Sequence, residues 1–209
     1  MLVMFPLNRE NGQILRTKGW LYEALGELML ELPFADITVG HICKRACVSR
    51  TVFYNHYNNK EDLLAEIFHR ITAVYRIKVQ RAAEENGPLR CRTCYTILCR
   101  ELWRSRVFFQ GLRKNHYDWM LSEFLEQIHD DFFQLVGRKS PPEELEYRQY
   151  FIPYHANALA ELLFRWLCEE KPAPPEQMAD VAVRLLNSSN VDCFLEMTAH
   201  GAKTGARQR

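Results

Sequence analysis

The chain has 209 residues, of which 47% are hydrophobic and 25% are charged, proportions typical of a folded globular protein. Its 27 basic and 26 acidic side chains give a formal net charge of +1, which excludes a uniformly basic coat, so any nucleic-acid site must be a local patch. No stretch approaches the roughly 18 apolar residues of a membrane span, and no signal peptide is recognisable. We therefore expect a cytoplasmic protein of one large or two small domains.

Apolar residues recur with helical spacing along most of the chain, and no strand-like alternation of useful length is present. The first stripe runs through residues 21–32 and stops at Pro33. Two short helices follow, with Thr38 and Ser49 as their caps, and a longer helix begins after Asn58 or Asn59. Later breaks at residues 86–88, 137–142 and 171–175 contain proline or glycine. The sequence thus predicts an all-α protein of about nine or ten helices.

The local charge is more informative than the total. Residues 38–60 carry no acidic side chain, although acidic residues flank them on both sides. The basic side chains of this segment are Lys44, Arg45, Arg50 and Lys60. Such a face attracts nucleic-acid phosphates, but on charge alone an ordinary solvated helical surface is the better explanation.

Residues 38–57 also have the pattern of a helix-turn-helix motif. A tight turn around residues 46–48 joins the two short helices, and Ser49 caps the second. The exposed side of that second helix carries groups that can bond to base edges and phosphates: Arg50, Thr51, Tyr54, Asn55 and His56. In such a motif one helix braces the other, which enters the major groove. An ordinary helical hairpin is the alternative, but it does not need an acid-free polar face, so DNA binding is favoured.

The run ITVGHICKRACVSRTVFYNHYNNKEDLL at residues 37–64 resembles the signature of the TetR/AcrR family of transcriptional regulators. The matching elements are Ile37-Thr38, Ala46-Cys47-Val48-Ser49, Phe53-Tyr54, His56-Tyr57 and Lys60-Glu61. Residues 17–34 resemble the first helix of the same family. Two positions depart from the pattern: Cys47 replaces the turn glycine, and Val52 replaces a frequent threonine. If residue 47 needs a positive φ, cysteine carries a modest cost there, and at Val52 one phosphate contact is missing.

The resemblance implies individual roles in DNA binding. The residues implied in phosphate contacts are Thr38, Tyr54, His56 and Lys60, and Ser49 belongs to the same surface. Arg50, Thr51 and Asn55 are implied to face base edges. Because a bidentate contact between arginine and guanine contributes about 1–3 kcal/mol of discrimination, Arg50 is the first candidate for specificity.

The same resemblance implies a DNA-binding domain at residues 10–70 and a regulatory and dimerisation domain at residues 71–200. In the family the second domain senses ligands and is variable. Residues 154–185 resemble a C-terminal type that includes activator-like and ligand-poor members. Residues 145–186 are expected to form a homodimer interface, with intramolecular core as the alternative, and a dimer suits a palindromic operator.

Aromatic residues crowd the middle of the chain and suggest a ligand pocket, although plain core packing is the alternative for each of them. The candidate pocket residues are Trp103, Phe108, Phe109, His116, Trp119 and Tyr154. The sequence assigns no ligand to this pocket.

Three of the seven scattered cysteines, Cys91, Cys94 and Cys99, lie close together in the sequence. Zinc would need a fourth ligand, and none stands at finger spacing, whereas Cys91 approaches the helix N-terminus that a redox pair favours. Phosphate-binding loops and hydrolase motifs are missing, so we expect no enzyme, cofactor or metal. Three functions remain: a ligand-responsive DNA-binding regulator, a partner-protein-dependent activator of the same fold, and a helical thiol or redox protein.

Overall fold

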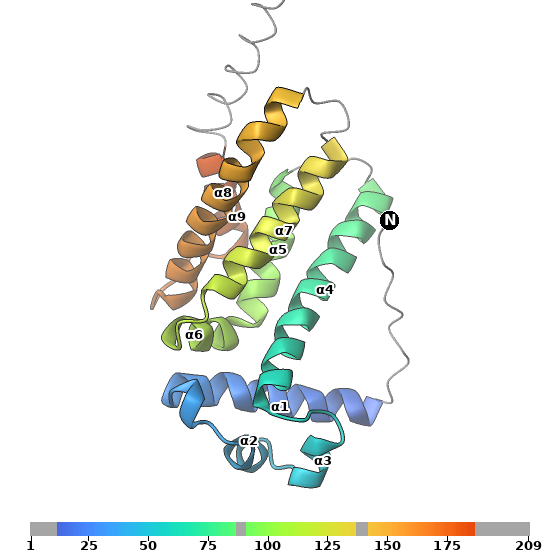
Figure 1. The fold of residues 1–209 in the computed structure, drawn as a ribbon, viewed down its shortest axis with the longest axis vertical. Coiled ribbons are helices and arrows are strands. Elements are labelled where there is room, and N and C mark those ends of the chain that lie inside the picture. Colours follow the sequence, from blue (N-terminus) through green and yellow to red (C-terminus); the bar gives the residue numbers. More distant parts are fainter. Residues whose placement is uncertain (1–11, 87–90, 137–141, 187–209) are drawn as a thin grey trace, which may run out of the picture. The chain divides into compact units, whose positions relative to one another are not determined.

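The computed structural model describes residues 12–86, 91–136 and 142–186 and confirms the all-α prediction. These residues form nine α-helices and one short 3-10 helix, with no strand among them (Figure 1). They fall into two compact units. The ends of the two predicted domains, at residues 10–11 and 187–200, lie outside the described residues. Residues 87–90 and 137–141 also lie outside them, and these include most of the predicted breaks at 86–88 and 137–142.

The first unit contains α1 (Gly12–Glu31), a 3-10 helix η1 (Phe34–Asp36), α2 (Val39–Arg45), α3 (Arg50–Tyr54) and the beginning of α4 (Lys60–Asn86). The division within α4 comes after Ile71. Leu21, Leu25 and Leu28 of the predicted apolar stripe are buried in α1, which ends two residues before Pro33. Asn59 caps α4, because its side-chain oxygen accepts the Asp62 N–H at 2.7 Å.

The first unit also includes Val107–Asn115, most of which lies in α6 (Arg106–Lys114). The backbones of α1 and α6 approach closely, since a Cβ built on Gly111 would lie 2.7 Å from the Met29 Cβ. The Asn115 side chain donates to the Met29 carbonyl at 2.8 Å, and the Lys114 ammonium donates to the Leu30 carbonyl. These bonds satisfy carbonyls that the last turn of α1 cannot pair within the helix.

This packing corrects part of the pocket prediction. Phe108 and Phe109 were expected to line a pocket of the second domain, but both belong to the first unit and are buried there. A Cβ on Gly26 of α1 would lie 3.4 Å from the Phe108 Cα, so the absent side chain lets the phenylalanine backbone approach α1. Burial of two phenylalanine rings stabilises this contact.

The second unit contains the rest of α4 together with α5 (Cys91–Arg104), α7 (Trp119–Val136), α8 (Pro142–Cys168) and α9 (Pro175–Leu186). Helix α5 packs on α9, and α7 packs on α8. Two ion pairs join α5 to α9, Arg92 with Asp180 at 2.6 Å and Arg100 with Glu176 at 2.8 Å. Within the described ranges, none of the helices combines the length and apolar character needed to cross a bilayer.

Candidate DNA-binding site

Helix α2 begins with a capping box that fixes Thr38. The Thr38 Oγ1 accepts the backbone N–H of His41 at 3.1 Å, and the His41 Nδ1 accepts the backbone N–H of Thr38 at 3.4 Å. The sequence analysis identified the cap but missed His41. Its position three residues after the cap, where glutamate or glutamine usually stands, was the available signal.

The turn between α2 and α3 closes as a Schellman motif. The Val48 N–H donates to the Cys43 carbonyl at 3.0 Å, and the Cys47 N–H donates to the Lys44 carbonyl at 3.3 Å. Cys47 has a φ of 54°, so the family's glycine position takes the left-handed conformation here as well. A cysteine in this conformation carries a steric cost that a glycine avoids.

Cys47→Gly is therefore expected to raise the free energy of unfolding by a few tenths to about 1 kcal/mol. The left-handed conformation costs an ordinary residue about 1–2 kcal/mol, and the greater entropy of an unfolded glycine cancels part of that gain. Urea unfolding followed by circular dichroism measures the change. Cys47→Ser keeps the strain and serves as the control, which should gain nothing. A Cys47→Gly variant no more stable than Cys47→Ser would contradict a strained turn.

Helix α3 presents the residues expected to contact DNA. The Ser49 Oγ accepts the Val52 N–H at 3.2 Å, which confirms Ser49 as the cap. Phe53 is buried and anchors the helix, and its neighbours on the other side are exposed: Arg50, Thr51, Tyr54 and Asn55. His56, half-buried, follows the helix, with its ring 6.2 Å from that of Tyr57.

The capping hydroxyls keep a donor for a ligand. Thr38 and Ser49 each use an oxygen lone pair to accept a helix N–H. A hydroxyl can accept and donate at once, so both O–H groups can still donate to a phosphate oxygen. The caps thus orient two of the predicted DNA-binding side chains.

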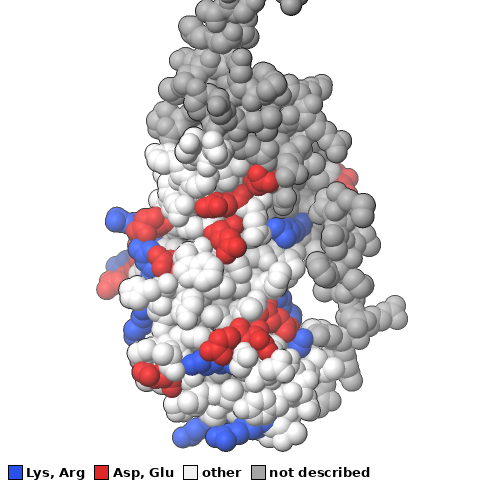
Figure 2. Space-filling model, in the orientation of Figure 1, with Lys and Arg blue, Asp and Glu red and all other residues white. Residues whose placement is uncertain are grey.

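The cationic face is smaller than the sequence suggested. Arg45 turns to α1, where it pairs with Glu27 at 3.1 Å and with Glu31 at 2.6 Å, and its hydrogen bond lowers the pKa of Glu31. Because these carboxylates offset its charge, Arg45 adds little to a phosphate site. Lys44 and Arg50 are exposed, and Figure 2 shows basic side chains at the end of the view where α2 and α3 lie.

Lys60 is also engaged within the first unit. Its ammonium donates to the carbonyls of Phe34 at 2.6 Å, Ala35 at 3.0 Å and Ile37 at 2.8 Å. It also lies 4.7 Å from the centre of the Phe34 ring. These three bonds use all the donors of an ammonium group. In this arrangement Lys60 tethers the segment that leads into α2, rather than offering a donor to phosphate.

A polar cluster ties α1 to the start of α4. The Glu66 carboxylate accepts from Lys18 at 2.9 Å and from the Tyr22 hydroxyl at 2.8 Å. Burial alone would raise the pKa of Glu66, but these hydrogen bonds outweigh burial and lower it. The cluster stays ionised at neutral pH and braces the two helices that flank the motif.

The other pocket candidates differ in their exposure, and the pocket stays a prediction. Trp119 and Tyr154 expose 56% and 61% of their surface. His116 is exposed at a φ of 61°. The Trp103 ring lies 5.4 Å from that of Trp166, so it packs on α8.

A buried polar cluster of Tyr95, His129 and His155 lies in the second unit. The Tyr95 hydroxyl lies 3.3 Å from the His129 Nε2, and burial, with the nearby His155, lowers the pKa of His129 to about 4. His155 is buried too, and its Nε2 has no hydrogen-bond partner among the described residues. Neutral imidazoles in this core act as hydrogen-bonding groups rather than as cations.

The cysteine cluster lacks the features of a thiol site. Burial raises the pKa of the Cys99 thiol to about 12 and also raises that of Cys94. Reactive thiols need the opposite shift, because the thiolate is the nucleophile. Across the part of the chain that is described, no three side chains of His, Cys, Asp or Glu gather as a metal site.

Comparison with known proteins agrees with this geometry. The model of the bacterial regulatory proteins of the tetR family matches residues 21–67. The uncharacterised HTH-type transcriptional regulator YxbF of Bacillus subtilis is 34% identical over 62 residues, which are 29% of this chain and 16% of that protein. The chain therefore spans only a small part of this curated relative.

Solved structures resemble the chain over most of its length. The dihydroxyacetone kinase operon activator DhaS has a TM-score of 0.56 at 21% identity, covering 81% of this chain and 93% of that one. Lin0861 from Listeria innocua has a TM-score of 0.61 at 17% identity, covering 88% and 97%. At these identities the likeness shows the fold alone.

The matched residues and the arrangement of α2 and α3 are those of a helix-turn-helix DNA-binding motif. The match to the tetR family model covers residues 21–67, which lie in the first unit.

Proposed function

We propose that this regulator acts as a cytoplasmic homodimer that binds a palindromic operator through α3 and whose DNA affinity is modulated at the second unit. The observation that carries the proposal is that α3, capped by the Ser49 hydroxyl, exposes a run of polar side chains: Arg50, Thr51, Tyr54 and Asn55. This arrangement supports phosphate contacts from the caps, and base contacts from Arg50, Thr51 and Asn55.

The surface of α8 and α9 supports dimerisation. Each helix exposes two large apolar side chains one turn apart, Tyr150 and Tyr154 on α8, and Val181 and Leu185 on α9. Residues four apart lie on the same face of a helix, so each pair forms an apolar stripe. Contiguous apolar stripes favour a protein interface, and they fall within residues 145–186.

The second unit is the proposed site of action of an effector. The Tyr95 hydroxyl and the imidazoles of His129 and His155 offer buried hydrogen-bonding groups that a small molecule could use. The alternative effector is a partner protein that turns the regulator into an activator. Both versions share the same DNA contacts.

Dimerisation through α9 is tested by Leu185→Glu, which is expected to convert a dimer to a monomer at micromolar concentration. The buried carboxylate would lack a partner, which disfavours the interface. Sedimentation equilibrium measures the mass. Trp20→Glu is the matched control, because Trp20 of α1 is 52% exposed and Leu185 is 53% exposed. A monomeric wild-type protein, or a dimeric Leu185→Glu variant, would contradict this interface.

A further inference from the structure

Gly40 of α2, which has no side chain, lies beside Arg50, the arginine expected to contact bases. A Cβ built on Gly40 would lie 2.8 Å from the Nη2 and 3.6 Å from the Cζ of Arg50. It would also lie 3.6 Å from the Thr38 Oγ1. The guanidinium of α3 therefore occupies the space that a side chain of α2 would fill.

The backbone does not explain this glycine. Gly40 lies inside α2 and does not take the left-handed conformation that favours glycine. In a helix interior glycine is among the least favourable residues, because it loses the most conformational freedom. A side chain at residue 40 would displace the Arg50 guanidinium, and the absence of this side chain therefore has its main consequence for Arg50.

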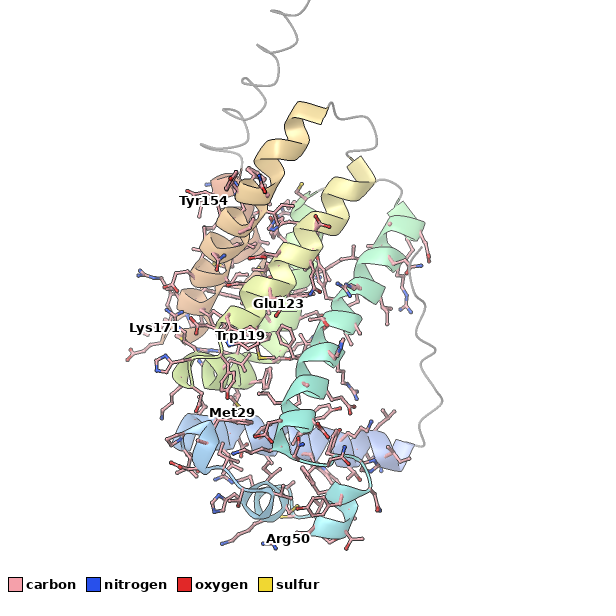
Figure 3. The ribbon with its side chains drawn as sticks, in the orientation of Figure 1. Met29, Arg50, Trp119, Glu123, Tyr154 and Lys171 are labelled. Carbon is pink, nitrogen blue, oxygen red and sulfur yellow. The ribbon has the colours of Figure 1, made fainter. Side chains whose placement is uncertain are left out.

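A second observation places Arg50 along the same face of α2. Cys43 lies three residues after Gly40, so the two share one face of the helix. Burial raises the pKa of the Cys43 thiol, and the positive charge of Arg50 opposes this rise. Arg50 thus lies close enough to act on Cys43 as well as against Gly40, at the end of the first unit where Figure 3 labels it.

We propose that Gly40 is a specificity-determining residue of the DNA site, which acts by leaving room for the Arg50 guanidinium beside α2. The inference rests on the proposed function, in which Arg50 contacts a base. A side chain at residue 40 would exclude the arginine from this position, and an arginine that already lies in its binding position loses less rotamer freedom when it meets the base. Gly40 is then a positioning residue, and the base that Arg50 selects depends on the absence of a side chain at residue 40.

The test uses the full-length protein and a duplex selected by the wild type from a randomised library. Gly40→Ala is expected to lower affinity for the selected duplex by about 5- to 30-fold, within the range of a bidentate base contact. On duplexes changed at the base pair that Arg50 contacts, the loss should nearly vanish. Gly19→Ala is the matched control, since a Cβ on Gly19 meets nothing within 4 Å. In an Arg50→Ala background, Gly40→Ala should have no further effect.

Two results would overturn the proposal. A loss equal on every duplex would mean that Gly40 governs the approach of the DNA backbone or the stability of the fold. A Gly40→Ala variant that behaves like Gly19→Ala would mean that the contact with Arg50 has no consequence.

A measurement without DNA separates this proposal from the proposed function. Failure of the wild type to select any duplex would contradict the proposed function. Nuclear magnetic resonance relaxation of the Arg50 Nε–Hε group in the free protein then tests the contact alone. Restricted motion in the wild type and increased motion in Gly40→Ala support the positioning role, and equal motion in both overturns it.

Discussion

Arg50→Ala is expected to weaken binding to the operator about 30-fold or more, while sequence-independent binding falls much less. The reason is that each half-site loses a base contact worth about 1–3 kcal/mol, and a dimer makes the contact twice. Titrations on the selected duplex and on a scrambled duplex at one salt concentration measure both losses. We therefore expect the ratio of specific to non-specific affinity to fall strongly, and not the affinity alone.

Arg45→Ala provides a control with the same change in charge in the same motif. Arg45 is paired with Glu27 and Glu31 of α1, so its removal frees two carboxylates without removing a predicted DNA contact. We expect little change in the ratio of specific to non-specific affinity. If Arg45→Ala and Arg50→Ala reduce that ratio equally, net charge determines recognition and the assignment of Arg50 to a base is wrong.

Gly111→Ala is expected to destabilise the protein by about 1–3 kcal/mol, the range of an overpacked core. The added Cβ would lie 2.7 Å from the Met29 Cβ and 3.3 Å from the Gly26 carbonyl oxygen. Both atoms belong to or adjoin the backbone of α1, so neither can turn away as the end of a long side chain would. Relief requires α1 and α6 to separate, which exposes Phe108 and Phe109.

Urea unfolding measures this change, and the same Gly19→Ala variant is the reference. Gly19 lies in α1 with open space around its Cα, so alanine there should stabilise the helix by up to about 1 kcal/mol. The difference between the two variants isolates the contact between α1 and α6. Equal stabilities for Gly111→Ala and the wild type would show that the two helices are not closely packed.

The local features of the first unit followed from the sequence. Residues 21–32 formed a helix that ended before Pro33, and Thr38, Ser49 and Asn59 became helix caps. These predictions depended on short-range rules that link a side chain to the backbone three residues away. The positive φ of Cys47 followed from the glycine that the resemblance places there.

The long-range features did not follow from the sequence. Nothing in the pattern of basic residues indicated that Arg45 would bond to α1 or that Lys60 would bond to three carbonyls around η1. The packing of Phe108 and Phe109 depended on Gly26 and Gly111, whose role appears only when two distant helices cross. Such contacts depend on tertiary geometry, which hydrophobic periodicity within one helix does not encode.

The proposed function requires that α3 of a symmetric dimer recognise a defined DNA sequence. Selection from a randomised duplex library by the purified wild-type protein, followed by titration at several salt concentrations, measures this recognition directly. We expect one enriched palindrome whose half-sites lie about one helical turn, roughly 10 base pairs, or a multiple apart, with affinity that falls steeply with salt. Enrichment of no sequence, or of a single site without two-fold symmetry, would contradict it.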